Sequence, residues 1–205
     1  RAAPSFFKPP HLGLVVISFL PPALAGYLLE EKIERHLGTP GTIAAGLLAG
    51  ALGMGAADAH SGPGRRSLAS ATMRDGLVLG IAQALALAPG VSRNGSTLAA
   101  ARLRGFSRED AQTLSWEIAL PVIIGASALK SARACQRGIP AGVGKALAAG
   151  TFASFGSTLL SARCLGDTRT RRRSLLPYAV YRGLLALLVI TRLRRNSTEH
   201  AARNH

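Results

Sequence analysis

The sequence predicts an all-α integral membrane protein with about five transmembrane helices and one broken, re-entrant helical hairpin. Three observations predict it: an apolar composition, a scarcity of charge, and the position of the charges. Hydrophobic residues make up 48 % of the 205 residues and charged residues only 17 %, whereas ordinary soluble domains carry roughly 25 % charged residues. The mean hydropathy is +0.23 and the formal net charge is +15.

The charges lie between long apolar stretches rather than within them. A helix needs roughly 20 apolar residues to cross a bilayer, and four stretches without any charged residue approach or reach that length: 9–29, 36–57, 76–92 and 146–162. A nucleic-acid-binding protein would distribute Lys and Arg along helix faces or strand edges instead. The pattern therefore indicates a lipid bilayer, not a nucleic acid, as the partner. Basic residues divide almost evenly between the two sides, so orientation stays open.

The first expected span is about 11–29. It contains Pro21 and Pro22, which predict a kink because proline removes a backbone donor and clashes with the preceding turn. A short charged loop is expected after it, at 30–36. The second span, about 41–58, contains the pattern Gly46-Leu47-Leu48-Ala49-Gly50. Small residues one turn apart predict that another segment packs closely against this helix.

The later spans are expected at about 107–129, 141–162 and 174–193. The first of these begins with Ser107 and Asp110, which have the spacing of a capping box. One polytopic membrane domain is expected over 1–193, followed by a polar C-terminal tail at 194–205.

The segment 76–104 is expected to form the hairpin. Its apolar part, 76–88, reaches only about 20 Å as a helix, and Pro89-Gly90 then ends it. A second short helix is expected over about 95–104, ended by Gly105. Neither half crosses the bilayer alone, so the break is expected to lie within the membrane. Irregular backbone at that depth is tolerated where protein buries it or where it lines a wet cavity.

The break holds the residues that we interpret as an anion site. Arg93 is charged in apolar surroundings, where an ionisable residue is costly and therefore functional by default. Its guanidinium suits phosphate oxygens, and the start of the second helix offers N–H groups and a positive dipole. Glycines for close approach and short polar donors surround it, namely Gly90, Ser92, Asn94, Gly95, Ser96 and Thr97. The alternative is that Arg93 reaches the interface beside Arg102 and Arg104.

The stretch around this break resembles the second signature of the undecaprenyl-diphosphate phosphatase family, the bacitracin-resistance proteins. The residues that resemble it are Gly80-Ile81-Ala82-Gln83-Ala84-Leu85-Ala86-Leu87-Ala88-Pro89-Gly90-Val91-Ser92-Arg93-Asn94-Gly95-Ser96-Thr97. The similarity continues through Gly105-Phe106-Ser107-Arg108, Ser115-Trp116, Ala119-Leu120-Pro121 and Leu176-Pro177-Tyr178-Ala179-Val180-Tyr181-Arg182. It covers essentially the whole chain.

The resemblance implies a multi-pass hydrolase of the bacterial plasma membrane. Such an enzyme converts undecaprenyl diphosphate to undecaprenyl phosphate and phosphate, which recycles the lipid carrier for peptidoglycan synthesis. By this similarity Arg93 and Ser92 are catalytic, with Arg93 clamping the diphosphate. The implied substrate-binding residues are Gln83, Gly90, Asn94, Gly95, Ser96 and Thr97. The family also implies a divalent cation, Mg²⁺ or Ca²⁺, although no ligands for it are evident in this sequence.

The sequence departs from the family pattern at three points. Asn94 stands where the family usually has Ser, and Glu117 stands where it usually has an apolar residue. The family's first signature, with paired Glu and a Ser-Ser-x-Gly-His stretch, has no match. We therefore expect a chain truncated at its N-terminus that holds the phosphate-binding half of the site, with little or no activity alone. Glu117 and Arg182 are hypothesised to pair, because isolated charges within spans are costly.

Other interpretations stay open at this point. A transporter or flippase for polyprenyl phosphate would use a broken helix and an anion site in the same way. A basic nucleic-acid-binding protein is favoured only by the net charge. The sequence does not decide between a monomer and a homo-oligomer.

Overall fold

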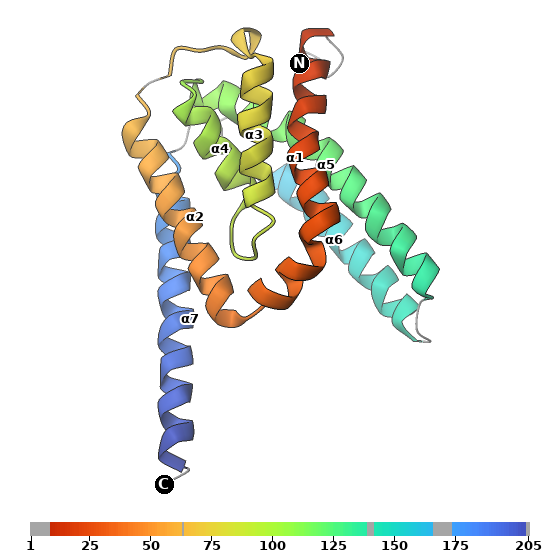
Figure 1. Ribbon diagram of the computed structural model, residues 1–205, viewed down its shortest axis with the longest axis vertical. Helices are drawn as coiled ribbons and strands as arrows, with labels where there is room; N and C mark the ends of the chain where they lie inside the picture. The colour runs from red at the N-terminus through yellow and green to blue at the C-terminus, as the bar shows by residue number, and fades with distance from the viewer. Residues whose placement is uncertain (1–8, 63, 139–141, 166–173, 204–205) are drawn as a thin grey trace. The chain divides into compact units, whose positions relative to one another are not determined.

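The computed structural model describes residues 9–62, 64–138, 142–165 and 174–203. The described residues are almost entirely helical, as predicted (Figure 1). Apart from an isolated bridge between Arg66 and Phe106, they contain no β-pairing. The elements in chain order are α1 (Pro9–Leu37), α2 (Pro40–His60), the 3₁₀ helix η1 (Leu68–Ser70), α3 (Met73–Leu85), α4 (Arg93–Leu103), α5 (Arg108–Arg137), α6 (Val143–Leu165) and α7 (Leu176–Arg203).

Four helices of the described chain are long and apolar enough to cross a membrane: Leu12–Ile33, Pro40–His60, Arg108–Gln136 and Leu176–Arg195. They match four of the five expected spans. The fifth expected span, 141–162, is confirmed as a helix, α6, but it is not one of these four. The protein is therefore an all-α, multi-pass membrane protein.

One expected element was wrong. Residues 30–36 are not a loop, because α1 continues through them to Leu37. Glu31 and Arg35 lie one turn apart there and form an exposed ion pair of 2.9 Å, which supports a helix that extends beyond its apolar stretch. The backbone of 194–203 likewise continues α7 as a helix, although its residues are as polar as expected.

The chain divides into two compact units. One unit comprises residues 1–122 and 174–205, and it contains the broken hairpin and a common apolar core in which Phe106, Leu114 and Ile118 are fully buried. The other unit, 123–173, contains the second part of α5 and α6. This division leaves the expected single membrane domain over 1–193 as a prediction.

The predicted broken hairpin is confirmed as α3 and α4, two short helices that pack against each other and are joined by a turn (Figure 1). Its first arm packs on α1 through two glycines one turn apart. A Cβ on Gly76 would lie 2.7 Å from the Leu14 carbonyl oxygen, and a Cβ on Gly80 would lie 2.7 Å from that of Ser18. Only glycine permits this contact, so the two backbones lie closer than side chains would allow.

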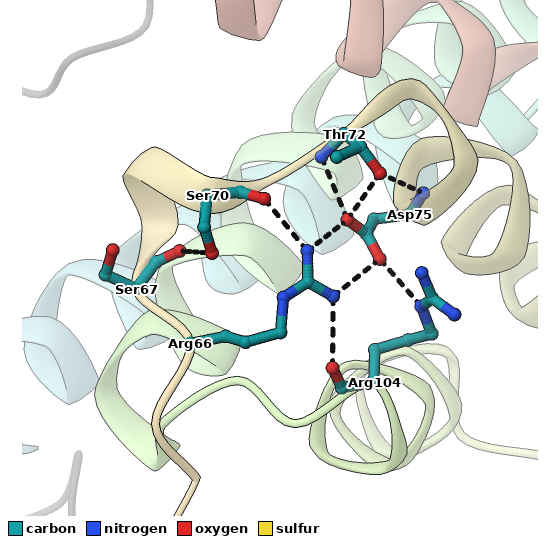
Figure 2. A network of polar contacts seen from close by, with 6 residues as sticks. All are labelled: Arg66, Ser67, Ser70, Thr72, Asp75 and Arg104. Carbon is teal, nitrogen blue, oxygen red and sulfur yellow. Dashed lines mark hydrogen bonds and ion pairs between the residues drawn. The ribbon is translucent and has the colours of Figure 1, made fainter.

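A buried carboxylate joins the two open ends of the hairpin. Asp75, at the start of α3, is fully buried and accepts hydrogen bonds from both terminal nitrogens of Arg66, at 3.0 and 2.7 Å. The Nε of Arg104, just after α4, donates to it at 2.7 Å. Thr72 adds its N–H and its hydroxyl, at 2.9 and 2.8 Å (Figure 2). The network thereby ties both ends of the hairpin to the loop before it.

Asp75 and Thr72 also form a reciprocal capping box at the start of α3. The box expected at α5 is only half formed. The Ser107 hydroxyl accepts from the Asp110 N–H at 3.1 Å, as predicted. The N–H of Ser107, however, donates to the Arg66 carbonyl at 3.1 Å and is not available to Asp110. The tertiary contact with Arg66 thus replaces the local bond.

Replacing Asp75 with Asn leaves two arginines without their shared carboxylate. Breaking one side of a buried ion pair typically costs 3–5 kcal/mol, so we expect Asp75→Asn to lower the free energy of unfolding by about 3 kcal/mol. Thermal unfolding in detergent micelles measures it. Glu31→Gln, which breaks the exposed pair on α1, is the matched control and should leave the midpoint unchanged. Equal effects of the two substitutions would contradict a structural role for the network.

The same network predicts acid sensitivity. Burial alone would raise the pKa of Asp75, but the hydrogen bonds from Arg66 and Arg104 outweigh burial and hold this pKa well below its usual range. A carboxyl whose pKa is depressed on folding contributes stability that is complete above its unfolded pKa of about 3.9 and is lost as the pH falls toward the folded value. Between about pH 5 and about pH 2, the wild type should therefore lose more stability than Asp75→Asn. Parallel pH profiles would show that Asp75 does not cause the loss.

Candidate functional site

The tip of the hairpin lies against the glycine face of α2. Gly90 has a φ of +92°, the left-handed conformation that glycine adopts without strain. A Cβ on Gly46 would lie 2.2 Å from the Pro89 carbonyl oxygen, and a Cβ on Gly90 would lie 2.2 Å from that of Ile43. The small-residue pattern at Gly46 and Gly50 is therefore confirmed as a packing surface. The segment it receives is an irregular turn rather than a helix.

Arg182 of α7 also reaches the tip. Its guanidinium donates a hydrogen bond to the Gly90 carbonyl, which the turn leaves without a helical partner. Gly50 lies beside it, since a Cβ there would be in ordinary van der Waals contact, 3.7 Å from a terminal nitrogen of Arg182. An exposed backbone carbonyl in hydrocarbon costs several kcal/mol, so Arg182 stabilises the break. Pairing between Glu117 and Arg182 stays a prediction.

The second arm of the hairpin begins at Arg93, two residues earlier than expected. Ser92 is its N-cap, with its hydroxyl accepting from the Gly95 N–H at 3.2 Å. Arg93 is thus the first residue of α4 rather than part of the turn. A helix leaves its first N–H groups without intrahelical acceptors. Since Ser92 satisfies that of Gly95, the N–H groups of Arg93 and Asn94 remain for a ligand.

Arg93 differs from the arginines around it. Arg102 is buried and donates to the carbonyls of Phe106 and Ser61, at 2.6 and 3.2 Å. Arg104 is paired with Asp75, and Arg182 with the Gly90 carbonyl. The half-buried Arg93 side chain has no hydrogen bond or ion pair with the described residues. Among these four arginines, Arg93 is the one whose guanidinium has no partner in the described structure. That Arg93 reaches an interface beside Arg102 and Arg104 stays the alternative, and both of those side chains have partners of their own in the fold.

Asn94 and Thr97 are linked through a residue of α5. The hydroxyls of Thr97 and Ser115 lie 2.5 Å apart, and the Ser115 hydroxyl lies 2.8 Å from Oδ1 of Asn94. Thr97 and Ser115 are each 1 % exposed, whereas Asn94 is exposed. Direct binding of a ligand by Thr97 stays a prediction, and its buried position favours a role in holding Asn94.

Gln83 faces α1. Proline at position 22 cannot donate to the Ser18 carbonyl, and the Nε2 of Gln83 lies 3.5 Å from that carbonyl oxygen. Gln83 is 1 % exposed, and its Oε1 has no hydrogen-bond partner in the described structure. Proline at position 22 therefore frees an acceptor for Gln83. The helix α1 changes direction in its second half (Figure 1).

The predicted glycines and serines are brought together at the start of α4, but some of them have other partners there. Gly95 is buried against Met54 of α2, whose Sδ would lie 2.5 Å from a Cβ at that position. Gly90 contacts α2, as described above. Ser96 is half buried in the first turn of α4. Close approach of a ligand to these glycines remains a prediction, because the contacts seen here are made by the protein itself.

Sequence reasoning missed Asp75, and it gave Ser115 no role. An Asp three residues after Thr72 is a capping signal that could have located the start of α3. Ser115 had no local signal, because it meets Asn94 only through the packing of α5 on α4.

The described residues contain no group of three His, Cys, Asp or Glu side chains that could hold a metal ion. Mg²⁺ and Ca²⁺ are bound mainly by carboxylates and other oxygen ligands. The described part of the chain thus does not fit a Mg²⁺ or Ca²⁺ site by itself, and the cation implied by the resemblance stays a prediction.

A family profile described as "Bacitracin resistance protein BacA" matches residues 8–188. The chain belongs to the BacA family. Proteins named undecaprenyl-diphosphatase are similar along most of it: that of Pelobacter propionicus is 39 % identical over 170 residues, that of Chromohalobacter salexigens 36 % over 176, and that of Geobacter sulfurreducens 38 % over 180.

These alignments cover 82 %, 86 % and 87 % of this chain and 62 %, 65 % and 66 % of the relatives. The chain therefore spans about two thirds of the length of the BacA-family relatives that it matches.

Two glycines of α2 offer a matched test of the docked tip. Gly46→Ala places a methyl group against the Pro89 carbonyl, whereas Gly53 has nothing within 4 Å of its added Cβ. Overpacking typically costs 1–3 kcal/mol, so Gly46→Ala should lower the free energy of unfolding by about 2 kcal/mol. Gly53→Ala should be neutral or stabilising, because Ala favours helix. Thermal unfolding of both variants in micelles measures this, and indistinguishable midpoints would refute the docking.

Proposed function

We propose that the protein containing this chain hydrolyses undecaprenyl diphosphate to undecaprenyl phosphate and phosphate. The names of the BacA-family relatives support this reaction. The observation on which it rests in this chain is Arg93, a guanidinium at the N-terminus of a helix that has no partner among the described residues. A diphosphate supplies the anionic oxygens that such an arrangement binds.

The reaction breaks the bond between the terminal phosphorus and the bridging oxygen. Water attacks the terminal phosphorus, the bridging oxygen leaves with the lipid phosphate, and one proton is released at neutral pH. Negative charge is rearranged among the phosphoryl oxygens in the transition state, and fixed positive groups lower the barrier by stabilising it. Arg93 and the free N–H groups at the start of α4 are placed to do this. Ser92 holds that helix start through its cap.

The described residues account for binding and charge stabilisation, and no general base is assigned to them. The all-α membrane fold suits such a substrate. Its polar headgroup would bind at the hairpin tip, and its polyprenyl chain would lie among apolar helices. We infer that the protein acts in the plasma membrane of a bacterium, where it returns the lipid carrier to cell-wall synthesis. A divalent cation and a homo-oligomeric state remain predictions.

A transporter of polyprenyl phosphate is the second candidate, since discontinuous helices build anion sites in transporters. The names of the relatives do not favour it. Hydrolysis in detergent micelles, where there is no membrane to cross, separates the two: a transporter would release no phosphate there.

Arg93 provides the decisive test. In the protein as its gene encodes it around residues 1–205, Arg93→Ala should reduce phosphate release from undecaprenyl diphosphate by roughly 100-fold or more, because a charge-assisted contact to the transition state is lost. Arg93→Lys should recover part of the rate, since it keeps the charge without the planar fork. Arg35→Ala, on the exposed end of α1, is the control. Normal turnover by Arg93→Ala would overturn the proposed role.

A further inference from the structure

The side chain of Asn94 stands at the start of α4 beside Arg93, and its amide can present either of two opposite groups to a ligand. The NH₂ group is a donor, and the carbonyl oxygen is an acceptor. Only the donor attracts an anionic oxygen. The direction in which this amide points therefore decides whether Asn94 helps or hinders the binding of a phosphate group.

The hydroxyls of Thr97 and Ser115 are the hydrogen-bond partners on the inner side of this amide. Each hydroxyl has a single proton. The two oxygens lie 2.5 Å apart, so a proton lies between them. The Ser115 oxygen also lies 2.8 Å from Oδ1 of Asn94, where only Ser115 can donate. Thr97 must then donate to Ser115, and Ser115 to Asn94. In this direction Thr97 gives its proton to Ser115 and not to the Arg93 and Asn94 carbonyl oxygens, which lie 3.0 and 3.1 Å from its hydroxyl.

The opposite direction also balances, if the amide is turned over. Asn94 would donate to Ser115, Ser115 to Thr97, and Thr97 to the Arg93 carbonyl, which lies 3.0 Å from its hydroxyl. That arrangement turns the Asn94 carbonyl oxygen outward. An anion at the start of α4 repels this oxygen and attracts the NH₂ group, so a bound anion favours the arrangement in which Oδ1 of Asn94 faces Ser115.

We propose that Ser115, with Thr97 behind it, is a positioning residue that orients the Asn94 amide so that its NH₂ group faces an anionic phosphate oxygen. The proposal rests on the proposed function, because it assigns the Asn94 donor to the same diphosphate that Arg93 binds. Ser115 and Thr97 are each 1 % exposed, and in this proposal they act through Asn94. They belong to different helices, so the contact between α4 and α5 also positions the amide.

This arrangement gives the departure of Asn94 from the usual Ser a structural reading. A serine hydroxyl rotates freely and can donate without being aligned. An asparagine amide must be held in one of its two orientations, and a neighbouring hydroxyl that donates to its oxygen does so. Asn94 should therefore depend on Ser115, whereas a serine at position 94 should not.

The test is a titration of the chain in detergent micelles with inorganic pyrophosphate, followed by calorimetry. Asn94→Ala should weaken binding about tenfold, because a hydrogen bond to a charged group is lost. Ser115→Ala should weaken it about fivefold, because the amide regains its rotational freedom. Ser115→Thr keeps the hydroxyl and should restore binding. In an Asn94→Ser background, Ser115→Ala should change affinity less than about twofold.

Thr113→Ala is the matched control, since Thr113 also lies on α5 and its hydroxyl donates only within that helix, to the Glu109 carbonyl at 3.1 Å. It should leave pyrophosphate affinity unchanged. A second measurement needs no variant: in chain labelled with ¹⁵N-asparagine, the side-chain NH₂ signals of Asn94 should shift on addition of pyrophosphate. Asn196 and Asn204, in the C-terminal tail, serve as internal references.

The outcomes separate the two proposals. If pyrophosphate binds and Arg93→Ala abolishes binding, but Ser115→Ala has no effect or the Asn94 signals do not move, the role of Ser115 is overturned while the anion site stands. If the unmodified chain binds no pyrophosphate, or Arg93→Ala binds it normally, the anion site fails, and the role of Ser115 fails with it.

Discussion

The fold depends on how the chain provides hydrogen-bond partners for backbone groups at the point where a helix is interrupted in apolar surroundings. The turn between α3 and α4 has carbonyls that no helix can pair, and in hydrocarbon such groups are too costly to leave exposed. Two features of other helices solve this. Glycines on α2 let the turn approach backbone to backbone, and Arg182 donates to the Gly90 carbonyl. With the tip held there, α4 can begin at a defined position, and its first N–H groups and Arg93 become a site.

The candidate site is distinguished by its arginine: several arginine side chains of the hairpin region have protein partners, whereas that of Arg93 has none among the described residues. Arg66 and Arg104 neutralise Asp75, and Arg102 binds backbone carbonyls. Each of these is part of the scaffold at the open end of the hairpin. Arg93 has no such engagement among the described residues. The chain belongs to the BacA family, and the relatives reported above are named undecaprenyl-diphosphatase, which is why we propose a diphosphate as the ligand of Arg93.

Local signals predicted the hairpin well. Pro89, Gly90 and Gly105 end helices through local backbone geometry alone. The two arms of the hairpin and their ends could therefore be predicted within a few residues. The loop expected at 30–36 was wrong because charged residues are good helix formers, and apolar length indicates a membrane span rather than the end of a helix. The expected fifth span, 141–162, forms the helix α6. Its composition alone does not decide whether α6 crosses the membrane.

The sequence by itself determined the all-α membrane class, the broken hairpin, the family resemblance and the cluster of polar residues around Arg93, because apolar length, helix breakers and motif spacing are local properties of the chain. Tertiary structure alone decided the partners: Arg182 with the tip, Asp75 with two arginines, and Ser115 with Asn94. These contacts join residues far apart in sequence. Helix packing decides which arginine or serine meets which acceptor. Local sequence patterns do not report on helix packing.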